Sequence, residues 1–259
     1  MLFFIPLGFI VGFLVSAVGV GAGVIMTPLL ILAGIPPIYA VGSDLVFSST
    51  SKALATALYG KKGEIHYRTV WLLLLGSLPA VAISYGVFLR IKEAVGFSYI
   101  NSIIKLLLGA VLVVLSLIYL HRLHFSSKSL EVNLTNSQQR AGLLIIGFIV
   151  GLLVFFTSVG SGTLVMAFLI YLMSSPQRLV GTDLAYSFII TTIAALLHVS
   201  LGTVNLFMVL LLLIGAIPGT YLGYKVNKRV PRRAFLTALA TILFLIGVLF
   251  VANTISTLF

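Results

Sequence analysis

Apolar residues fill eight long stretches of the 259-residue chain and leave only short polar connections between them. The stretches cover approximately residues 2–33, 38–59, 69–89, 98–120, 142–172, 179–201, 205–224 and 234–252. A transmembrane helix needs about 20 consecutive apolar residues. The pattern therefore predicts an all-α polytopic membrane protein, with no room for a separate soluble domain.

Composition agrees with this prediction. Hydrophobic residues make up 60% of the chain, charged residues 8%, and the mean hydropathy is +1.22. A soluble domain has about a quarter of its residues charged, so we expect the outer surface to face the lipid bilayer. We interpret the net charge of +11 as orienting charges in cytoplasmic loops rather than as a nucleic-acid surface. Cysteine is absent, which excludes disulfides and thiolate metal sites, and we expect no cofactor.

The chain matches itself when it is shifted by 139 residues. Chance explains matches of Leu and Val in an apolar chain, but not Gly, Pro, Asp and Arg in register at one offset. The matched pairs include Gly8 with Gly147, Gly12 with Gly151, Pro37 with Pro176, Asp44 with Asp183, Pro79 with Pro218 and Arg90 with Arg229. The repeat predicts two homologous four-segment halves, residues 1–120 and 142–259, joined by a polar cytoplasmic linker at 121–141.

The positive charges test how the two halves are oriented, because Lys and Arg concentrate on the cytoplasmic side. Eight full crossings would make the halves parallel, with eight loop Lys and Arg residues inside and six outside. If the long first segment of each half is a hairpin that enters and leaves on one side, the halves are inverted. The count then becomes twelve inside against two outside, Arg90 and Lys92. The charges favour inverted repeats.

The length of the first segment also favours a break. Residues 2–33 as one helix would reach about 48 Å, too long for one crossing of a core about 30 Å thick and too short for two. We expect breaks near Gly19–Gly23 and, in the second half, near Ser158–Gly162. Each half would then have a broken or re-entrant first helix followed by three transmembrane helices. Inverted repeats with interrupted helices are typical of secondary transporters.

The two breaks contain candidate substrate contacts. A half-helix that begins there presents unpaired N–H groups and the positive end of its dipole, and glycine allows an anion to approach the backbone closely. The alternative is close helix packing through small residues. The candidates are Gly21, Ala22, Gly23, Gly160, Ser161 and Gly162.

Lys52 is a candidate anion ligand in the second apolar segment. It follows a run of hydroxyl side chains that includes Ser48 and Ser49, and its repeat partner is Thr191. An ammonium group that faces a polar path would attract an anion, with the hydroxyls as further donors. The alternative is that Lys52 extends its side chain to the membrane surface, about eight residues from either end of its helix.

Asp44 and Asp183 are the carboxylates that lie inside apolar segments, and they are repeat partners. Intramembrane ionisable residues are costly and indicate function, here gating or coupling to protons or other ions. The alternative is structural, with each carboxylate accepting hydrogen bonds from the nearby hairpin. His198 is a further candidate for proton coupling, and the alternative is a single structural hydrogen bond.

Several motifs resemble the sulfite exporter TauE/SafE family, also called the 4-toluene sulfonate uptake permease superfamily. They are Met26-Thr27-Pro28-Leu29-Leu30, Gly34-Ile35-Pro36-Pro37 and Ala40-Val41-Gly42-Ser43-Asp44-Leu45, with partial copies in the second half. The resemblance covers essentially the full length and implies transport of sulfite, thiosulfate, sulfonates or related anions across the cytoplasmic membrane. The second half departs from the pattern, with Ala167 at the place of Pro28.

The sequence therefore predicts an alternating-access secondary transporter whose partner is a small anion. An anion channel, or a membrane-embedded subunit of a larger complex, remains the alternative. An enzyme is not expected. Ser161 and His198 could imitate an intramembrane Ser–His protease, but Val159 stands where that family has a glycine.

Overall fold

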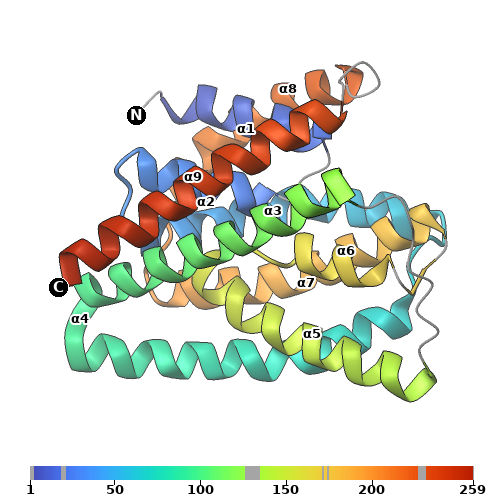
Figure 1. Ribbon diagram of the computed structural model, residues 1–259, viewed down its shortest axis with the longest axis horizontal. Helices are drawn as coiled ribbons and strands as arrows, with labels where there is room; N and C mark the ends of the chain where they lie inside the picture. The colour runs from blue at the N-terminus through green and yellow to red at the C-terminus, as the bar shows by residue number, and fades with distance from the viewer. Residues whose placement is uncertain are drawn as a thin grey trace.

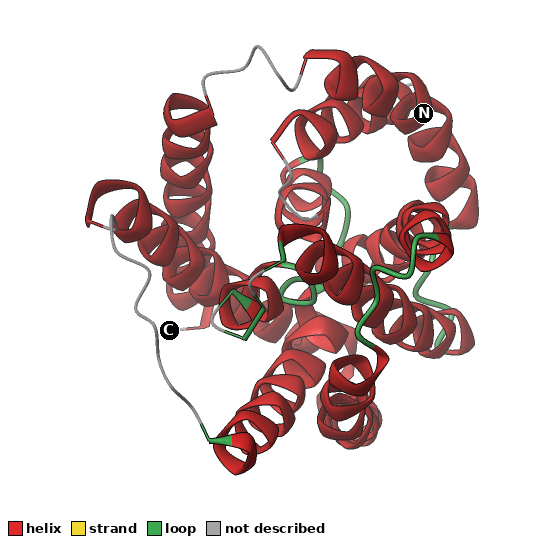
Figure 2. Ribbon diagram, turned by 90° about the vertical axis from the view of Figure 1, so that its right-hand side faces the viewer, coloured by secondary structure: helices red, strands yellow, loops and turns green. Residues whose placement is uncertain are grey.

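The structure is a computed structural model that describes residues 3–18, 22–125, 135–170, 172–173, 175–226 and 232–258. This part of the chain contains helices and loops but no strand, as the end-on view in Figure 2 shows. The helices, labelled in Figure 1, are α1 Phe4–Val18, α2 Ala22–Leu32, α3 Pro37–Lys61, α4 Tyr67–Phe125, α5 Asn136–Thr157, α6 Thr163–Leu169, α7 Pro176–Ser200, α8 Leu206–Val226 and α9 Arg232–Leu258.

Two of the apolar stretches are broken where their glycines predict. Helix α1 ends at Val18 and α2 begins at Ala22, whereas α5 ends at Thr157 and α6 begins at Thr163. With 11 residues in α2 and 7 in α6, these helices are about 16 and 10 Å long. Both are too short to cross a membrane alone. In the second of these stretches the described residues 158–162 form irregular backbone that is mostly buried in the protein.

Helix α4 consists of two helical segments that meet at Gly96. Its 59 residues include Gly96, whose φ of 74° and ψ of −177° interrupt the helix. Figure 1 shows the chain reversing its direction along α4. The sequence predicts two segments here with a connecting loop. A single glycine replaces that loop, because its backbone adopts a positive φ without a steric penalty.

Helix α3 is more polar than the other long helices. Five stretches of the described chain are long and apolar enough to cross a membrane, namely Tyr67–His121, Asn136–Thr157, Gln177–Ser200, Leu206–Gly223 and Thr237–Ser256. With 25 residues α3 is also long enough, but it carries Asp44, Lys52 and a run of hydroxyl side chains. Most of these polar groups lie inside the protein, because α3 packs against α7 and α2.

Helices extend from both sides into the predicted linker, residues 121–141. Helix α4 continues to Phe125 and α5 begins at Asn136. The start of α5 is set by a capping box, in which the Thr135 side chain accepts from Gln138 N–H and the Gln138 side chain accepts from Thr135 N–H. Such a box satisfies the unpaired donors of the first helical turn.

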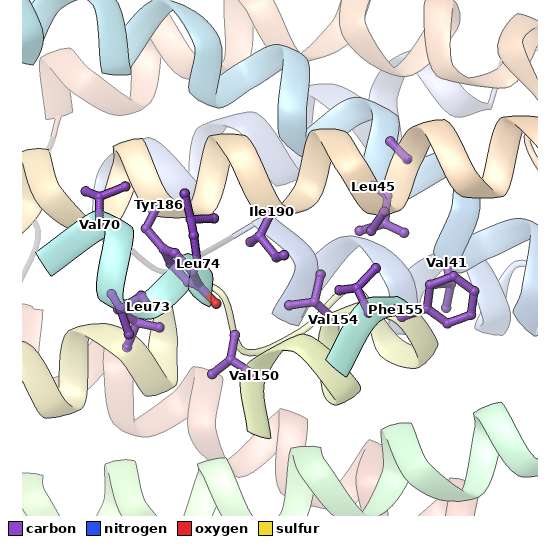
Figure 3. Close-up of a cluster of buried hydrophobic side chains, with 14 of the residues drawn as sticks. Val41, Leu45, Val70, Leu73, Leu74, Val150, Val154, Phe155, Tyr186 and Ile190 are labelled. Carbon is purple, nitrogen blue, oxygen red and sulfur yellow. The ribbon is translucent and has the colours of Figure 1, made fainter. Parts of the chain in front are cut away.

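The helices of the two predicted halves pack across each other. Helix α1 lies along α8, α5 lies along the first part of α4, and α9 lies along the rest of α4. Two hydrophobic clusters result. One combines α1 and α2 with α8 and α9, and the other combines α5, α6 and α7 with α3 and α4. Figure 3 shows the second cluster, with Tyr186 of α7 beside Leu73 and Leu74 of α4. Neither predicted half has a core of its own.

The contacts between the halves recur at the 139-residue offset. Ser43 Oγ accepts from the N–H of Asn205 at 3.1 Å, and its repeat partner Thr182 accepts through Oγ1 from the N–H of His66 at 2.9 Å. The positions 66 and 205 are also 139 residues apart. Close glycine contacts recur in the same way: Gly8 lies against Leu212 and Gly147 against Leu73, Gly76 against Leu144 and Gly215 against Ile5, and Gly42 against Thr203 and Gly181 against Glu64.

These glycine contacts lead to a stability prediction. A Cβ at Gly215 would overlap the carbonyl of Ile5 on α1, so Gly215→Ala should destabilise the α1–α8 pair by about 1–3 kcal/mol through overpacking. Gly86 is exposed and has nothing within 4 Å of its Cβ position, which makes Gly86→Ala a matched control. Thermal unfolding in detergent should show a lower midpoint for Gly215→Ala alone. Equal midpoints for the two variants would contradict the packing.

Candidate functional site

The two helix breaks meet inside the protein. Gly23, at the start of α2, lies so close to the Ser158 carbonyl that any Cβ there would overlap it. Ala22 and Gly23 are both buried. Gly21 lies outside the described residues. The structure thus brings together Ala22 and Gly23 from the first break and the loop 158–162 from the second.

The second break is held by hydrogen bonds from its own helix and from α7. Ser158 caps α5 in the left-handed conformation with φ 59°, and Gly160 has φ 112°, a value that requires glycine. Thr157 Oγ1 accepts from the N–H of Val159 at 3.2 Å. The Ser187 hydroxyl on α7 donates to the carbonyl of Ser161. The loop therefore has a defined shape although it is not helical.

Lys52 reaches this loop from α3. Its Nζ donates to Ser161 Oγ at 3.0 Å, and the Lys52 side chain is partly buried. Its charge interacts with the carboxylates of Asp183 and Asp44, but it forms no direct ion pair with either of them. The long α3 thus carries an ammonium group into the second break, where the sequence predicts substrate contacts.

Asp44 is fully buried and has both oxygens bonded. Thr27 Oγ1 on α2 donates to Oδ2 at 2.5 Å, and Ser48 Oγ donates to Oδ1 at 3.1 Å. Ser48, a predicted substrate ligand, is thus used by Asp44. Ser49 donates to the Val46 carbonyl of its own helix at 3.0 Å. Asp44 ties α2 to α3, in agreement with a structural contribution.

Asp183 is buried but incompletely bonded. Its side chain is 3% exposed, and Oδ1 has no hydrogen-bond partner among the described residues. Its other oxygen lies 3.7 Å from the Cβ position of Gly162. A buried acceptor without a donor costs about 1–3 kcal/mol. Because one of its oxygens is unbonded, Asp183 is a stronger candidate for a functional residue than its repeat partner Asp44, whose oxygens are both bonded.

Two hydroxyl groups at the same break, Ser158 Oγ and Thr163 Oγ1, are also buried without a hydrogen-bond partner among the described residues. On α7, one turn after Asp183, Tyr186 Oη is buried in the same way. The Ser158 hydroxyl lies beside the Asp44 carboxylate. Buried polar groups are normally bonded, so this concentration of free donors is unusual. The sequence analysis missed Ser158, Thr163 and Tyr186, because isolated hydroxyls in an apolar chain carry no pattern.

His198 is fully bonded near the end of α7. Its Nε2 lies 3.0 Å from the Phe155 carbonyl, and its Nδ1 lies 2.9 Å from Thr203 Oγ1. A Cβ on Gly42 would also come within 3.1 Å of Nδ1. The structure does not connect His198 with Lys52 or Asp183 through any hydrogen bond. Its role in proton coupling stays a prediction.

The long apolar helices define the class of protein, a multi-pass membrane protein. Within this class the family is also established. Residues 4–250 match the family described as Sulfite exporter TauE/SafE, and the chain belongs to this transporter family.

Two relatives agree with this assignment. The probable membrane transporter protein YjnA of Bacillus subtilis (strain 168) is 35% identical over 248 residues, which cover 94% of this chain and 96% of the relative. The probable membrane transporter protein YunE of the same organism is 24% identical over 259 residues, which cover 94% of each chain. No solved structure matches the chain significantly.

The bonding of Asp44 leads to a second prediction. Thr27→Val removes the 2.5 Å donor and leaves a buried carboxylate oxygen without a partner, which should cost about 1–3 kcal/mol of unfolding free energy. Thr50 is exposed and bonds only to Val46 of its own helix, so Thr50→Val is the control. Chemical denaturation in detergent should separate the two variants. An unchanged midpoint for Thr27→Val would show that the bond does not hold α2 to α3.

Proposed function

We propose that this protein is a secondary transporter for a small oxyanion, which binds at the second helix break with Lys52 as its central ligand. The observation that carries the proposal is the hydrogen bond from Lys52 Nζ to Ser161 Oγ, which puts an ammonium group beside an irregular loop inside the helical bundle. Lys52 has two further N–H donors that no hydrogen bond uses.

The chemistry around Lys52 suits an oxyanion. Thr163 adds an unpaired hydroxyl donor at the end of the same loop, and an oxyanion accepts several hydrogen bonds at once. Bonds between an ammonium and an anion are roughly twice as strong as neutral ones. Thr191, the repeat partner of Lys52, is uncharged, and its hydroxyl donates to the Ser187 carbonyl at 2.7 Å. An ammonium group at this position is therefore present in the first half only.

The substrate class follows from the family and from this donor set. The family is described as a sulfite exporter family, and sulfite, thiosulfate and organosulfonates share a compact group of negatively charged oxygens. Such a group matches an ammonium with surrounding hydroxyls better than a bulky or cationic solute would. A sulfur-containing oxyanion or organosulfonate is the substrate class proposed here.

Inverted repeats and alternating access complete the proposal. In Figure 1, α1 starts at the left-hand end of the bundle whereas α5, its repeat partner, starts at the right-hand end. The shortness of α2 and α6, the recurring contacts between the halves and the charge count of twelve against two all support an inverted arrangement. The two mixed clusters would then move against each other around α3 and α7.

Cysteine labelling tests the inverted arrangement, and the chain has no natural cysteine to remove first. Lys61, Glu93 and Lys225 are exposed. In intact cells an impermeant maleimide should label Glu93→Cys from outside and should reach Lys61→Cys and Lys225→Cys only after permeabilisation. Parallel halves would instead place Lys61 and Lys225 on opposite sides. Labelling of Lys61→Cys but not Lys225→Cys in intact cells would therefore refute the inverted arrangement.

Lys52→Met tests the binding site. The change keeps the length of the side chain and removes its charge, so anion affinity should fall at least about tenfold and uptake should drop to background. Lys105→Met is the matched control, because Lys105 also lies within a long helix but contacts the Phe250 ring, 5.6 Å from its centroid. Counterflow of radiolabelled sulfite in proteoliposomes measures both variants.

The outcomes of this experiment separate the alternatives. Monodisperse Lys52→Met protein with normal counterflow would refute the site. A wild-type protein that dissipates an anion gradient but shows no counterflow would be a channel. A thermal-shift screen against sulfite, thiosulfate, organosulfonates and carboxylates checks the substrate class, because a bound ligand stabilises the native state.

A further inference from the structure

The formal charges around the second break do not add up to a positive site. Lys52 contributes one positive charge where its ammonium bonds to Ser161, and Asp183 lies beside the next residue of the loop, Gly162. Asp44 lies on the same helix as Lys52, two turns before it. With both carboxylates ionised the cluster carries one net negative charge, and an arriving anion would double it. Repulsion is strong at this depth because the effective dielectric constant is low.

A proton on one of the two carboxylates resolves this conflict. The cluster would then be neutral before the anion binds and would carry one negative charge afterwards, the same as the empty ionised cluster. Binding of the anion together with the proton would therefore add no net charge to the ionised cluster. Intramembrane carboxylates commonly carry protons in transporters. The question is which of the two carboxylates accepts the proton.

Asp44 is built to remain a carboxylate. It accepts hydrogen bonds from two hydroxyl groups, of Thr27 at 2.5 Å and of Ser48 at 3.1 Å, one on each oxygen. Protonation would place a hydrogen where one of these donors already points. The bond to Thr27 also joins α2 to α3, so protonation of Asp44 would weaken a contact between helices.

Asp183 has the opposite surroundings. Its Oδ1 is buried and receives no hydrogen bond from the described residues. Its other oxygen lies 3.7 Å from the Cβ position of Gly162, next to Ser161, which accepts the hydrogen bond of the Lys52 ammonium. Tyr186, one turn further along α7, is the other titratable neighbour, and its hydroxyl is also unpaired. An anion that takes over Lys52 would leave an ionised Asp183 with no compensation.

We propose that Asp183 couples anion transport to protons: a monovalent anion occupies Lys52 only when Asp183 is protonated, and one proton enters the site with each anion. This inference rests on the proposed function of Lys52. The anion replaces Asp183 as the counter-charge of the ammonium, and the proton neutralises the carboxylate that is released. By linkage, protonation and the anion strengthen each other's binding by the same factor.

The sign of the pH dependence follows directly. Above the pH at which Asp183 loses its proton in the free protein, the competent fraction falls tenfold for each pH unit. The apparent Kd of the anion therefore rises tenfold per unit. Methanesulfonate is a suitable probe, because it is the anion of a strong acid and keeps its single negative charge across the neutral range. Sulfite itself titrates near neutrality and would obscure the effect.

Calorimetry of the purified wild-type protein in two buffers of different ionisation enthalpy counts the protons taken up on binding. We expect the binding of one methanesulfonate to be accompanied by the binding of one proton at alkaline pH, and of less than one proton on average as the pH falls. Asp183→Asn should bind the anion with a pH-independent affinity and no proton uptake. Asp44→Asn, the repeat-related control, should keep the proton uptake of the wild type even if its stability falls.

Each outcome decides between the two proposals. If the wild-type protein binds neither methanesulfonate nor sulfite at any pH, the proposed function fails and this inference fails with it. If it binds methanesulfonate with no proton uptake, or only with sodium, the coupling through Asp183 is wrong while the site at Lys52 stands. Proton uptake that persists in Asp183→Asn would likewise overturn the assignment. The wild-type measurement remains decisive if Asp183→Asn does not fold.

Discussion

The structure depends on one constraint: the peptide groups of a broken helix cannot face lipid. Each break must therefore be covered by protein. Ser187 of α7 satisfies the carbonyl of Ser161, and Gly23 of the first break packs onto the carbonyl of Ser158 in the second. Because the second break is covered by the start of α2 and by α7, the two predicted halves pack across each other. This explains why α1 pairs with α8 and α5 with α4, and why neither half has a core of its own.

The packing of the two halves across each other also explains why α3, the most polar of the long helices, lies inside the protein. Helix α3 packs against α2 and α7, and so its hydroxyls and charges meet other polar groups instead of lipid. A buried charge is tolerated only when it is compensated. Lys52 has Ser161 and two carboxylates near it, and Asp44 has two hydroxyl donors. Asp183 lacks such donors, and this imbalance separates it from its repeat partner.

The contacts that join the two halves are symmetric, whereas the residues at the two helix breaks are not. Ser43 and Thr182 make equivalent hydrogen bonds to the opposite half. The residues that line the breaks differ: Lys52 corresponds to Thr191 and Ser161 to Ala22. The contacts that recur in both halves hold the two halves together. The differences between the halves place the Lys52 ammonium and the Ser161 hydroxyl at one break only, where we propose that the anion binds.

The membrane class, the positions of both breaks and the candidates Lys52, Asp44 and Asp183 were predictable from the sequence. Each depends on a local property, such as apolar length, glycine content or a charge inside an apolar run. The state of each carboxylate was decided only by the tertiary structure. Thr27 and Ser48 donate hydrogen bonds to Asp44, whereas no described residue donates one to Oδ1 of Asp183. Thr27 lies 17 residues from Asp44, and Ser161 lies 109 residues from Lys52. Hydrogen bonds over such separations depend on how helices pack, and no local pattern along the chain records that packing.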